Sequence, residues 1–214
     1  MKGLETWRLA PGRKGLQTSG LSTLAWHQPR ALPTRAFALG QPLNATPIQV
    51  HETQKNRVLI FEDSVCKTLG SARHAACHAR REIEALRLLA GIRGIPVILA
   101  LGLDRKSLVM SRVLGTPMSE CKHVSEGTMK SLRSLVEQML QRGVARHSLP
   151  PRDVIVAADG SAGLVDFERS TRRLFAWDPS WFVAKAVTRF HMLRLLQAHA
   201  PQLMTQSERS RLSV

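Results

Sequence analysis

The chain has 214 residues, with 31 Lys and Arg against 16 Asp and Glu, so its formal net charge is +15. This length suits one domain, or one domain with a tail, and allows a substantial buried core. The charge favours polyanionic partners such as nucleotides, phosphorylated glycans, anionic lipids or nucleic acid, without choosing among them. Three cysteines without a pairing pattern (Cys66, Cys77 and Cys121) indicate a reducing compartment.

Membrane-spanning and secretory segments are not expected. No apolar run approaches the roughly 20 residues that a membrane-spanning helix needs. The basic N-terminus lacks the continuous apolar stretch of a secretory signal. We therefore expect no transmembrane segment and a cytoplasmic protein, which its positive charge could hold on an anionic membrane surface.

Residues 1–47 differ in composition from the rest of the chain. They contain five prolines and six basic residues, against one acid, Glu5. No helical or strand period persists there, which predicts a loosely ordered arm. Trp7 and Trp26 are unusual in such an arm and suggest that part of it docks onto the main body. The composition also suits an organelle transit peptide.

The next segments predict a strand hairpin. Two apolar runs, residues 57–61 and 64–69, are separated by Glu62 and Asp63. Lys67 shares one face of the second strand with Val65. A lysine on an apolar face is costly unless an anion meets it. The alternative is an edge-strand lysine whose amine reaches solvent.

Residues 72–90 predict an amphipathic helix with an apolar stripe. At about 100° per residue Glu82 falls on this stripe, whereas Glu84 falls on the opposite, solvent-facing side. An inward glutamate requires a cation, and Lys67 is the candidate. His74, Cys77 and His78 also share a helical face at metal-ligand spacing. No further ligand is obvious nearby, so an ordinary basic helix surface is preferred to a zinc site.

Further elements follow from periodicity. Residues 96–101 and 108–113 predict a strand pair, and residues 128–144 a helix with apolar side chains at i, i+3, i+4, i+7 and i+8. Asp178 and Pro179 predict the start of a helix over residues 180–198. Its apolar residues surround most of the circumference, which predicts a central helix. Residues 201–214 are expected to form a frayed tail.

The stretch of residues 143–170 contains the candidate chemistry. Residues 154–156 and 163–167 predict two strands joined by the Asp159–Gly160 turn. The hairpin carries Asp153 before its first strand and Asp166 at the end of its second, so pairing would bring the carboxylates together. Two such carboxylates can hold a hard cation such as Mg²⁺. The alternative is that Asp153 caps a turn and Asp166 ends a strand.

This stretch resembles the catalytic segment of the protein-kinase-like fold. Residues 146–153 (RHSLPPRD) occupy the place of the H-x-D-L-x-x-x-N motif, and residues 166–168 (DFE) that of D-F-G. The Pro-bearing loop and the run VDFERSTRR are similar to the bacterial lipopolysaccharide core kinase group, the heptose and Kdo kinases. The resemblance covers about residues 57–195.

The resemblance implies an α+β, two-lobed protein-kinase-like fold of reduced size. A small N-lobe, about residues 48–114, would hold an antiparallel sheet and one helix, and a helical C-lobe would span about 115–200. The implied activity is an ATP-dependent phosphotransferase (a kinase) acting on a hydroxyl of a lipopolysaccharide core sugar or a protein Ser/Thr. Such a protein would be cytoplasmic or peripheral at the inner membrane.

Site roles follow from the same resemblance. Lys67 would bind the ATP phosphates, Glu82 would orient Lys67, and the backbone around Ser111 and Val113 would receive adenine. Asp166 would hold Mg²⁺, with Asp153 as a second ligand. The cluster Arg169, Arg172 and Arg173 would face a phosphorylated glycolipid or protein acceptor, although a solvated basic loop explains it equally well.

Two departures from the kinase pattern define the alternatives. Ser148 lies where the catalytic-base Asp belongs, and residues 57–69 contain no Gly-rich phosphate loop. His147 could act as a stand-in base, or Arg146 and His147 could simply bind phosphate or solvent. A pseudokinase that binds nucleotide without turnover is therefore the main alternative. A basic nucleic-acid binder is weaker, because no recognised nucleic-acid-binding motif supports it.

Overall fold

The computed structural model describes residues 7–9, 46–53, 56–69, 75–102 and 107–212. The fold is α+β, as predicted, and the chain divides into two compact units. Unit 1 comprises residues 1–75 and 98–112, and unit 2 comprises residues 76–97 and 113–214. From the sequence we expected the helix of residues 72–90 to belong to the first lobe. In the structure, residues 76–90 belong to unit 2.

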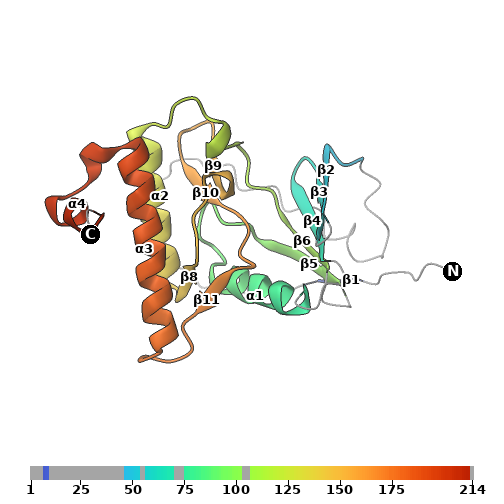
Figure 1. Ribbon diagram of the computed structural model, residues 1–214. Helices are drawn as coiled ribbons and strands as arrows, with labels where there is room; N and C mark the ends of the chain where they lie inside the picture. The colour runs from blue at the N-terminus through green and yellow to red at the C-terminus, as the bar shows by residue number, and fades with distance from the viewer. Residues whose placement is uncertain (1–6, 10–45, 54–55, 70–74, 103–106, 213–214) are drawn as a thin grey trace, which may run out of the picture. The chain divides into compact units, whose positions relative to one another are not determined.

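Unit 1 is an antiparallel sheet (Figure 1). Within the described residues its strand order is β1-β5-β6-β4-β3-β2. The predicted hairpin is present, and its register sets Lys67 between Val58 and Leu108 on the neighbouring strands. Apolar side chains on one face form a small core around Phe61, with Cys66, Ala100 and Val109. The strands are β1 (Trp7–Leu9), β2 (Gln49–Glu52), β3 (Asn56–Ile60), β4 (Ser64–Leu69), β5 (Ile98–Gly102) and β6 (Ser107–Ser111).

Most of the predicted N-terminal arm, including Trp26, lies outside the described residues. Within its described part, β1 pairs with β5 in the register Trp7↔Gly102. Trp7 therefore docks onto the main body through backbone pairing, as its presence in a Pro-rich segment suggested.

Unit 2 contains the longer helices and two small sheets, of order β10-β9-β7 and β11-β8. Helices α2 and α3 lie side by side (Figure 1). The elements are α1 (Ala75–Leu88), β7 (Thr116–Pro117), η1 (Met118–Glu120), α2 (Glu126–Gln141), β8 (Val144–Arg146), η2 (Pro151–Asp153), β9 (Val154–Val156), β10 (Ala162–Leu164), β11 (Ser170–Arg172), α3 (Pro179–His199), η3 (Pro201–Leu203) and α4 (Gln206–Leu212).

Helix α2 confirms the predicted period but begins two residues earlier than expected. Ser125 caps it by accepting a hydrogen bond from the Thr128 amide at 3.0 Å. The apolar positions of the predicted stripe, from Leu132 to Leu140, are all buried. The burial of this stripe supplies most of the helix's stability, because isolated helices of this length are marginal in water.

The second hairpin strand is shorter than predicted. Strand β10 ends at Leu164, whereas the sequence suggested a strand through Phe167. Asp166 has a φ of 65°, in the left-handed region, so extended pairing cannot continue through it. The turn allows the Phe167 ring to enter the core, where it is completely buried.

Helix α3 is not the fully enclosed central helix that its composition predicted. Asp178 caps it through the amides of Ser180 and Trp181, as expected. Trp181 is buried, but Phe182, Val183 and Phe190 are exposed. The positions of apolar residues around a helix do not by themselves show which of its faces are buried in the folded protein.

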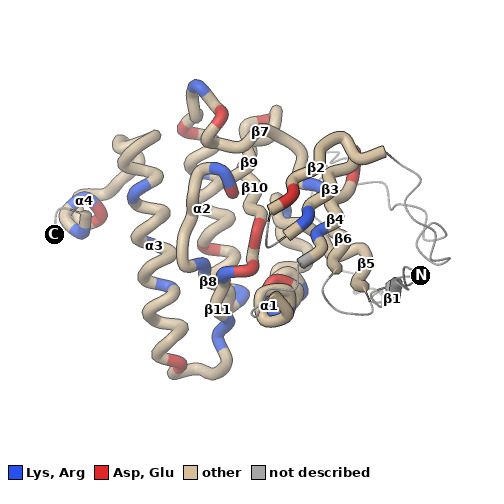
Figure 2. Tube along the Cα trace, turned by 45° about the vertical axis from the view of Figure 1, so that its right-hand side comes forward, with Lys and Arg blue, Asp and Glu red and all other residues tan. Residues whose placement is uncertain are grey.

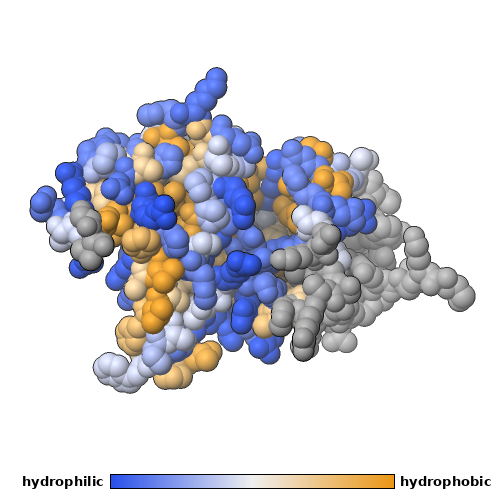
Figure 3. Space-filling model, in the orientation of Figure 1, coloured by the Kyte–Doolittle hydropathy of each residue, from blue (hydrophilic) through white to orange (hydrophobic). Residues whose placement is uncertain are grey.

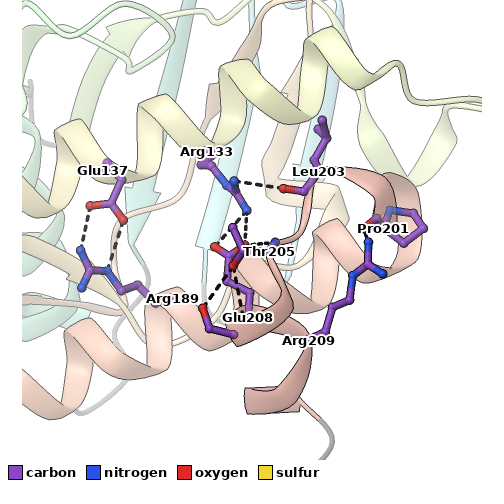
Figure 4. A network of polar contacts seen from close by, with 9 residues as sticks. Arg133, Glu137, Arg189, Pro201, Leu203, Thr205, Glu208 and Arg209 are labelled. Carbon is purple, nitrogen blue, oxygen red and sulfur yellow. Dashed lines mark hydrogen bonds and ion pairs between the residues drawn. The ribbon is translucent and has the colours of Figure 1, made fainter.

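The described part of the C-terminal tail, residues 201–212, is largely helical rather than frayed. The Arg133 guanidinium donates to both carboxylate oxygens of Glu208 at 3.1 Å and to the Leu203 carbonyl (Figure 4). Glu208 also accepts a hydrogen bond from the Thr205 amide at the start of α4. These long-range polar contacts hold a segment whose own helical propensity and apolar content are low.

No helix among the described residues is long and apolar enough to cross a membrane.

Gly94 fits a close approach between the α1–β5 connection and β10. Its φ is +81°, its carbonyl accepts from the Leu164 amide, and an added Cβ would lie 2.6 Å from the Ala162 carbonyl oxygen. We expect Gly94→Ala to lower the free energy of unfolding by about 2–4 kcal/mol, through left-handed strain and overpacking. Gly91→Ala, with similar φ but open space around it, should cost only about 1–2 kcal/mol in urea denaturation. Equal costs would exclude the steric contribution.

The Asp178 cap predicts a pH dependence. Hydrogen bonds, the one from the Ser180 hydroxyl first, hold the pKa of Asp178 below its usual 3.8. A carboxylate with a lowered folded-state pKa stabilises the fold above its unfolded pKa and loses that effect as the pH falls through the folded value. The melting temperature of Asp178→Ala should therefore fall well below wild type at pH 7, and the difference should shrink on acidification below about pH 4. A difference that stays constant with pH would contradict an ionic cap.

Candidate functional site

The hairpin of unit 2 brings the two predicted carboxylates to one end. Its register pairs Val154 with Leu164, so Asp153 and Asp166 flank the same end of the ladder. The Val165 amide extends the pairing by donating to the Asp153 carbonyl at 3.0 Å. Asp153 is buried and Asp166 half-buried. The predicted convergence of the two residues is therefore present in the fold.

The Asp153 carboxyl group interacts with several charged side chains at this site. Burial raises the pKa of its carboxyl, the Arg146 guanidinium opposes that rise, and the Asp166 carboxylate adds to it. One oxygen accepts from Arg146 Nη2 at 2.5 Å, while the other lies 3.7 Å from Arg152 Nε. Two carboxylates that repel each other in a partly buried setting gain from a cation. Carboxylate oxygens are the ligands that Mg²⁺ prefers, and Mg²⁺ binding by Asp153 and Asp166 remains a prediction.

Arg146 has a structural role that corrects its interpretation as a phosphate- or solvent-binding residue. Its side chain is buried, and besides Asp153 it donates to the Val165 carbonyl at 2.8 Å. The guanidinium carbon lies 5.4 Å from the centroid of the Phe167 ring. The Thr188 hydroxyl of α3 bonds both the amide and the carbonyl of Arg146. Arg146 thus ties β8, the hairpin and α3 together.

The segment after Asp166 is joined to α1. The Phe167 amide donates to Glu82 Oε1 at 3.4 Å, and Glu82 is only 1 % exposed. The helical period had placed Glu82 inward, and the structure confirms that direction. Glu84, expected on the solvent side, is half-buried and pairs with Arg172 at 2.9 Å. Glu82 therefore binds the backbone of the residue that follows Asp166, and both residues belong to unit 2.

His147 and Ser148 follow Arg146 in the loop. His147 is exposed, and its Nε2 lies 2.7 Å from the Thr171 hydroxyl of β11. Ser148 is half-buried. The loop therefore carries an imidazole at its surface, and the assignment of His147 as a base remains a prediction.

Two of the residues that the sequence predicts to bind nucleotide, Lys67 and Ser111, lie on the central strands of unit 1. Lys67 is 6 % exposed on β4, and Ser111 ends β6 opposite Ser64. Val113 begins unit 2 and packs against Gly163, where an added Cβ would crowd its side chain. Lys67 and Glu82 belong to different units, so their pairing, like adenine binding at 111–113, remains a prediction.

The basic cluster after Asp166 is only partly available. Arg172 is engaged by Glu84, whereas Arg169 and Arg173 are exposed. No group of three or more His, Cys, Asp or Glu side chains within the described part of the chain could by itself hold a metal ion. Cys77 and His78 are therefore not part of such a group within the described residues, and His74 lies outside them.

Two features of the site escaped sequence reasoning. The internal bonding of Arg146 has no periodic signature, because an arginine in a short strand usually reaches solvent. Thr188 lies among apolar residues of α3, and a polar residue in such a setting was the signal for an inward hydroxyl.

Similarity to known proteins is confined to three-dimensional structure. A co-crystal structure of WbdD with the kinase inhibitor LY294002 matches with a TM-score of 0.51 and 20% identity, over 70% of this chain and 37% of that one. A 2.2 Å crystal structure of WbdD matches with a TM-score of 0.49 and 18% identity, over 78% and 50% of the two chains. A further structure, of WbdD as a bifunctional kinase-methyltransferase, matches with a TM-score of 0.47 and 20% identity, over 74% of this chain and 46% of that one.

This chain therefore spans half or less of the length of these WbdD structures. No protein-family model matches it, and no curated protein sequence matches it. At such identity the likeness concerns the fold alone. The chain has a small α+β fold similar to that of the kinase-containing protein WbdD.

Proposed function

We propose that this protein binds ATP with Mg²⁺ and transfers phosphate to a hydroxyl group. The observation that carries the proposal is the convergence of Asp153 and Asp166 at one end of the β9–β10 hairpin, with their mutual repulsion. A bound Mg²⁺ would neutralise charge on the transferred phosphate. Asp166 and the Asp153 oxygen remote from Arg146 are the ligands we assign to it.

Other residues support phosphate chemistry as part of the proposal. Lys67 would bind phosphate oxygens, and Glu82 would position it, while the backbone at Ser111 and Val113 would bind adenine. Arg169 and Arg173, exposed beside the Asp166 segment, suit a phosphorylated acceptor such as a lipopolysaccharide core sugar. A protein Ser/Thr is the other acceptor class.

A nucleotide-binding protein without turnover is the second candidate, and two observations favour it. Ser148 is too weak an acid–base group to replace a catalytic carboxylate, whose loss typically slows transfer by roughly 10²–10⁴-fold. In addition, Arg146 already bonds one Asp153 oxygen. Phosphoryl transfer depends mostly on positioning and charge neutralisation, so these features slow the reaction without excluding it.

A thermal-shift titration with ATP tests nucleotide binding. We expect ATP to raise the melting temperature of the wild type more with Mg²⁺ than without it, because a ligand that binds only the folded state stabilises it. Lys67→Met should lose this shift, measured relative to its own ligand-free melting temperature. Arg57→Met, which changes an exposed residue of neighbouring β3, should keep it.

The outcomes separate the candidates. A wild-type protein that gives no shift with ATP, with or without Mg²⁺, contradicts both. A Mg²⁺-dependent shift with no release of phosphate or labelling of any acceptor leaves the non-catalytic candidate alone.

A further inference from the structure

An exposed apolar segment leads into α3. Between β11 and the helix, Leu174, Phe175 and Trp177 are 69 %, 59 % and 82 % exposed. Val183, in the first turns of α3, is 65 % exposed, and Phe182 is also exposed. Large apolar side chains that gather in this way on a surface mark an interaction site rather than ordinary scatter.

The apolar surface continues along α3. A groove of about 430 Å³ runs beside the helix, lined by Phe182, Ala186, Phe190 and Leu193 together with the side chains of Lys185, Arg189 and Arg211. Figure 3 shows apolar patches over α3 and over the loop that leads into it. We call the loop residues Leu174, Phe175 and Trp177, with Phe182, Val183 and Phe190 of α3, the α3 surface.

Positive charge accompanies the α3 surface. Residues 169–200 contain six Lys and Arg and one acid, Asp178, which is buried as the helix cap. Figure 2 shows basic residues along β11 and α3. Arg172 and Arg189 are paired with glutamates. Within the described residues, the side chains of Arg169, Arg173 and Lys185 have no ion pair or hydrogen bond.

Aromatic and basic side chains in this combination match one kind of partner best. Trp and Phe concentrate at the boundary between lipid headgroups and acyl chains. Lys and Arg on the same helix gain from anionic lipids, and an apolar helix face buries itself shallowly in the interface. Arg172 and Arg189 are paired with glutamates, but the side chains of Arg169, Arg173 and Lys185, which have no acidic partner within the described residues, favour an anionic lipid surface over an uncharged apolar protein partner.

We propose that the α3 surface binds an anionic membrane surface, with Leu174, Phe175 and Trp177 entering the interface and Arg169, Arg173 and Lys185 contacting lipid phosphates. Arg169 and Arg173 are shared with the acceptor side of the proposed phosphotransfer, whereas the membrane contact of the apolar residues goes beyond that function. It would bring lipid-borne hydroxyls to the protein.

Co-sedimentation of the full chain with vesicles tests the proposal. We expect binding to vesicles of phosphatidylcholine and phosphatidylglycerol, and little binding to phosphatidylcholine alone. Replacing Leu174, Phe175 and Trp177 together with serine should weaken binding at least about tenfold. Replacing Arg169, Arg173 and Lys185 with glutamine should weaken it roughly 100-fold at low salt.

Matched variants control for general effects. Leu114→Ser and Ile48→Ser remove exposed apolar side chains elsewhere, and Arg57, Lys122 and Arg87 changed together to glutamine remove the same number of exposed charges. Both controls should bind vesicles nearly as the wild type does. Wild-type binding of the serine variant, or no binding by the wild type, overturns the proposal. Concentration-dependent self-association lost in the serine variant, without vesicle binding, would assign the surface to a second copy and also overturn it.

Discussion

Replacement of Arg146 with methionine is expected to lower the free energy of unfolding by about 3–5 kcal/mol, because it leaves a buried Asp153 without its cation. Arg146 and Asp153 are 4 % and 9 % exposed. The methionine also forfeits the hydrogen bond to the Val165 carbonyl. Urea denaturation at neutral pH measures the effect, and the pKa of Asp153 should rise further in the variant.

A double variant and an exposed pair serve as controls. Arg146→Met combined with Asp153→Leu should recover most of the loss, since apolar replacement of a buried ion pair is often neutral. Arg189→Met breaks a half-exposed pair with Glu137 and should cost only about 0–1 kcal/mol. A single Arg146 variant as stable as Arg189→Met would refute a buried, structural role for this arginine.

Replacement of Asp166 with asparagine is expected to reduce Mg²⁺-dependent phosphate release from ATP by roughly 10²–10³-fold, because it removes the carboxylate that we assign to the metal. Asparagine is chosen because it tolerates the left-handed backbone that Asp166 adopts. The variant should remain folded, with a melting temperature near that of the wild type. Turnover as a function of Mg²⁺ concentration separates lost affinity from lost rate.

Asp159→Asn provides the matched control for this experiment. Asp159 lies at the turn of the same hairpin, where it accepts from Ser161 and pairs with Arg93 at 2.6 Å. This variant should turn over ATP as the wild type does. If the Asp166→Asn variant were as active as the wild type, the carboxylate pair would have no part in the mechanism.

The strongest periodic signals in the sequence predicted the elements that position the site. The α2 stripe, the Asp178–Pro179 helix start and the Asp159–Gly160 turn were all local signals, and each element is present. The inward direction of Glu82 followed from helical geometry alone. Local chemistry fixed these features because each depends on residues a few positions apart.

Features that depend on distant residues were missed. The α4 segment is polar, and its helix is held by contacts such as Arg133 to Glu208, 75 positions away. The turn at Asp166 accompanies the burial of Phe167, which depends on packing in the folded core and not on the residues next to Asp166. The internal role of Arg146 likewise requires the fold, because its partners come from the hairpin and from α3.

The division of the chain between the two units limits how the protein can be cut. Because residues 76–97 belong to unit 2 while residues 98–112 return to unit 1, the backbone passes between the units at three places. A fragment starting at residue 113 would lack α1, and with it the Glu82 acceptor of the Phe167 amide. Neither unit can therefore be excised by a single truncation, and a stand-alone version of either would require a circularly permuted or spliced gene.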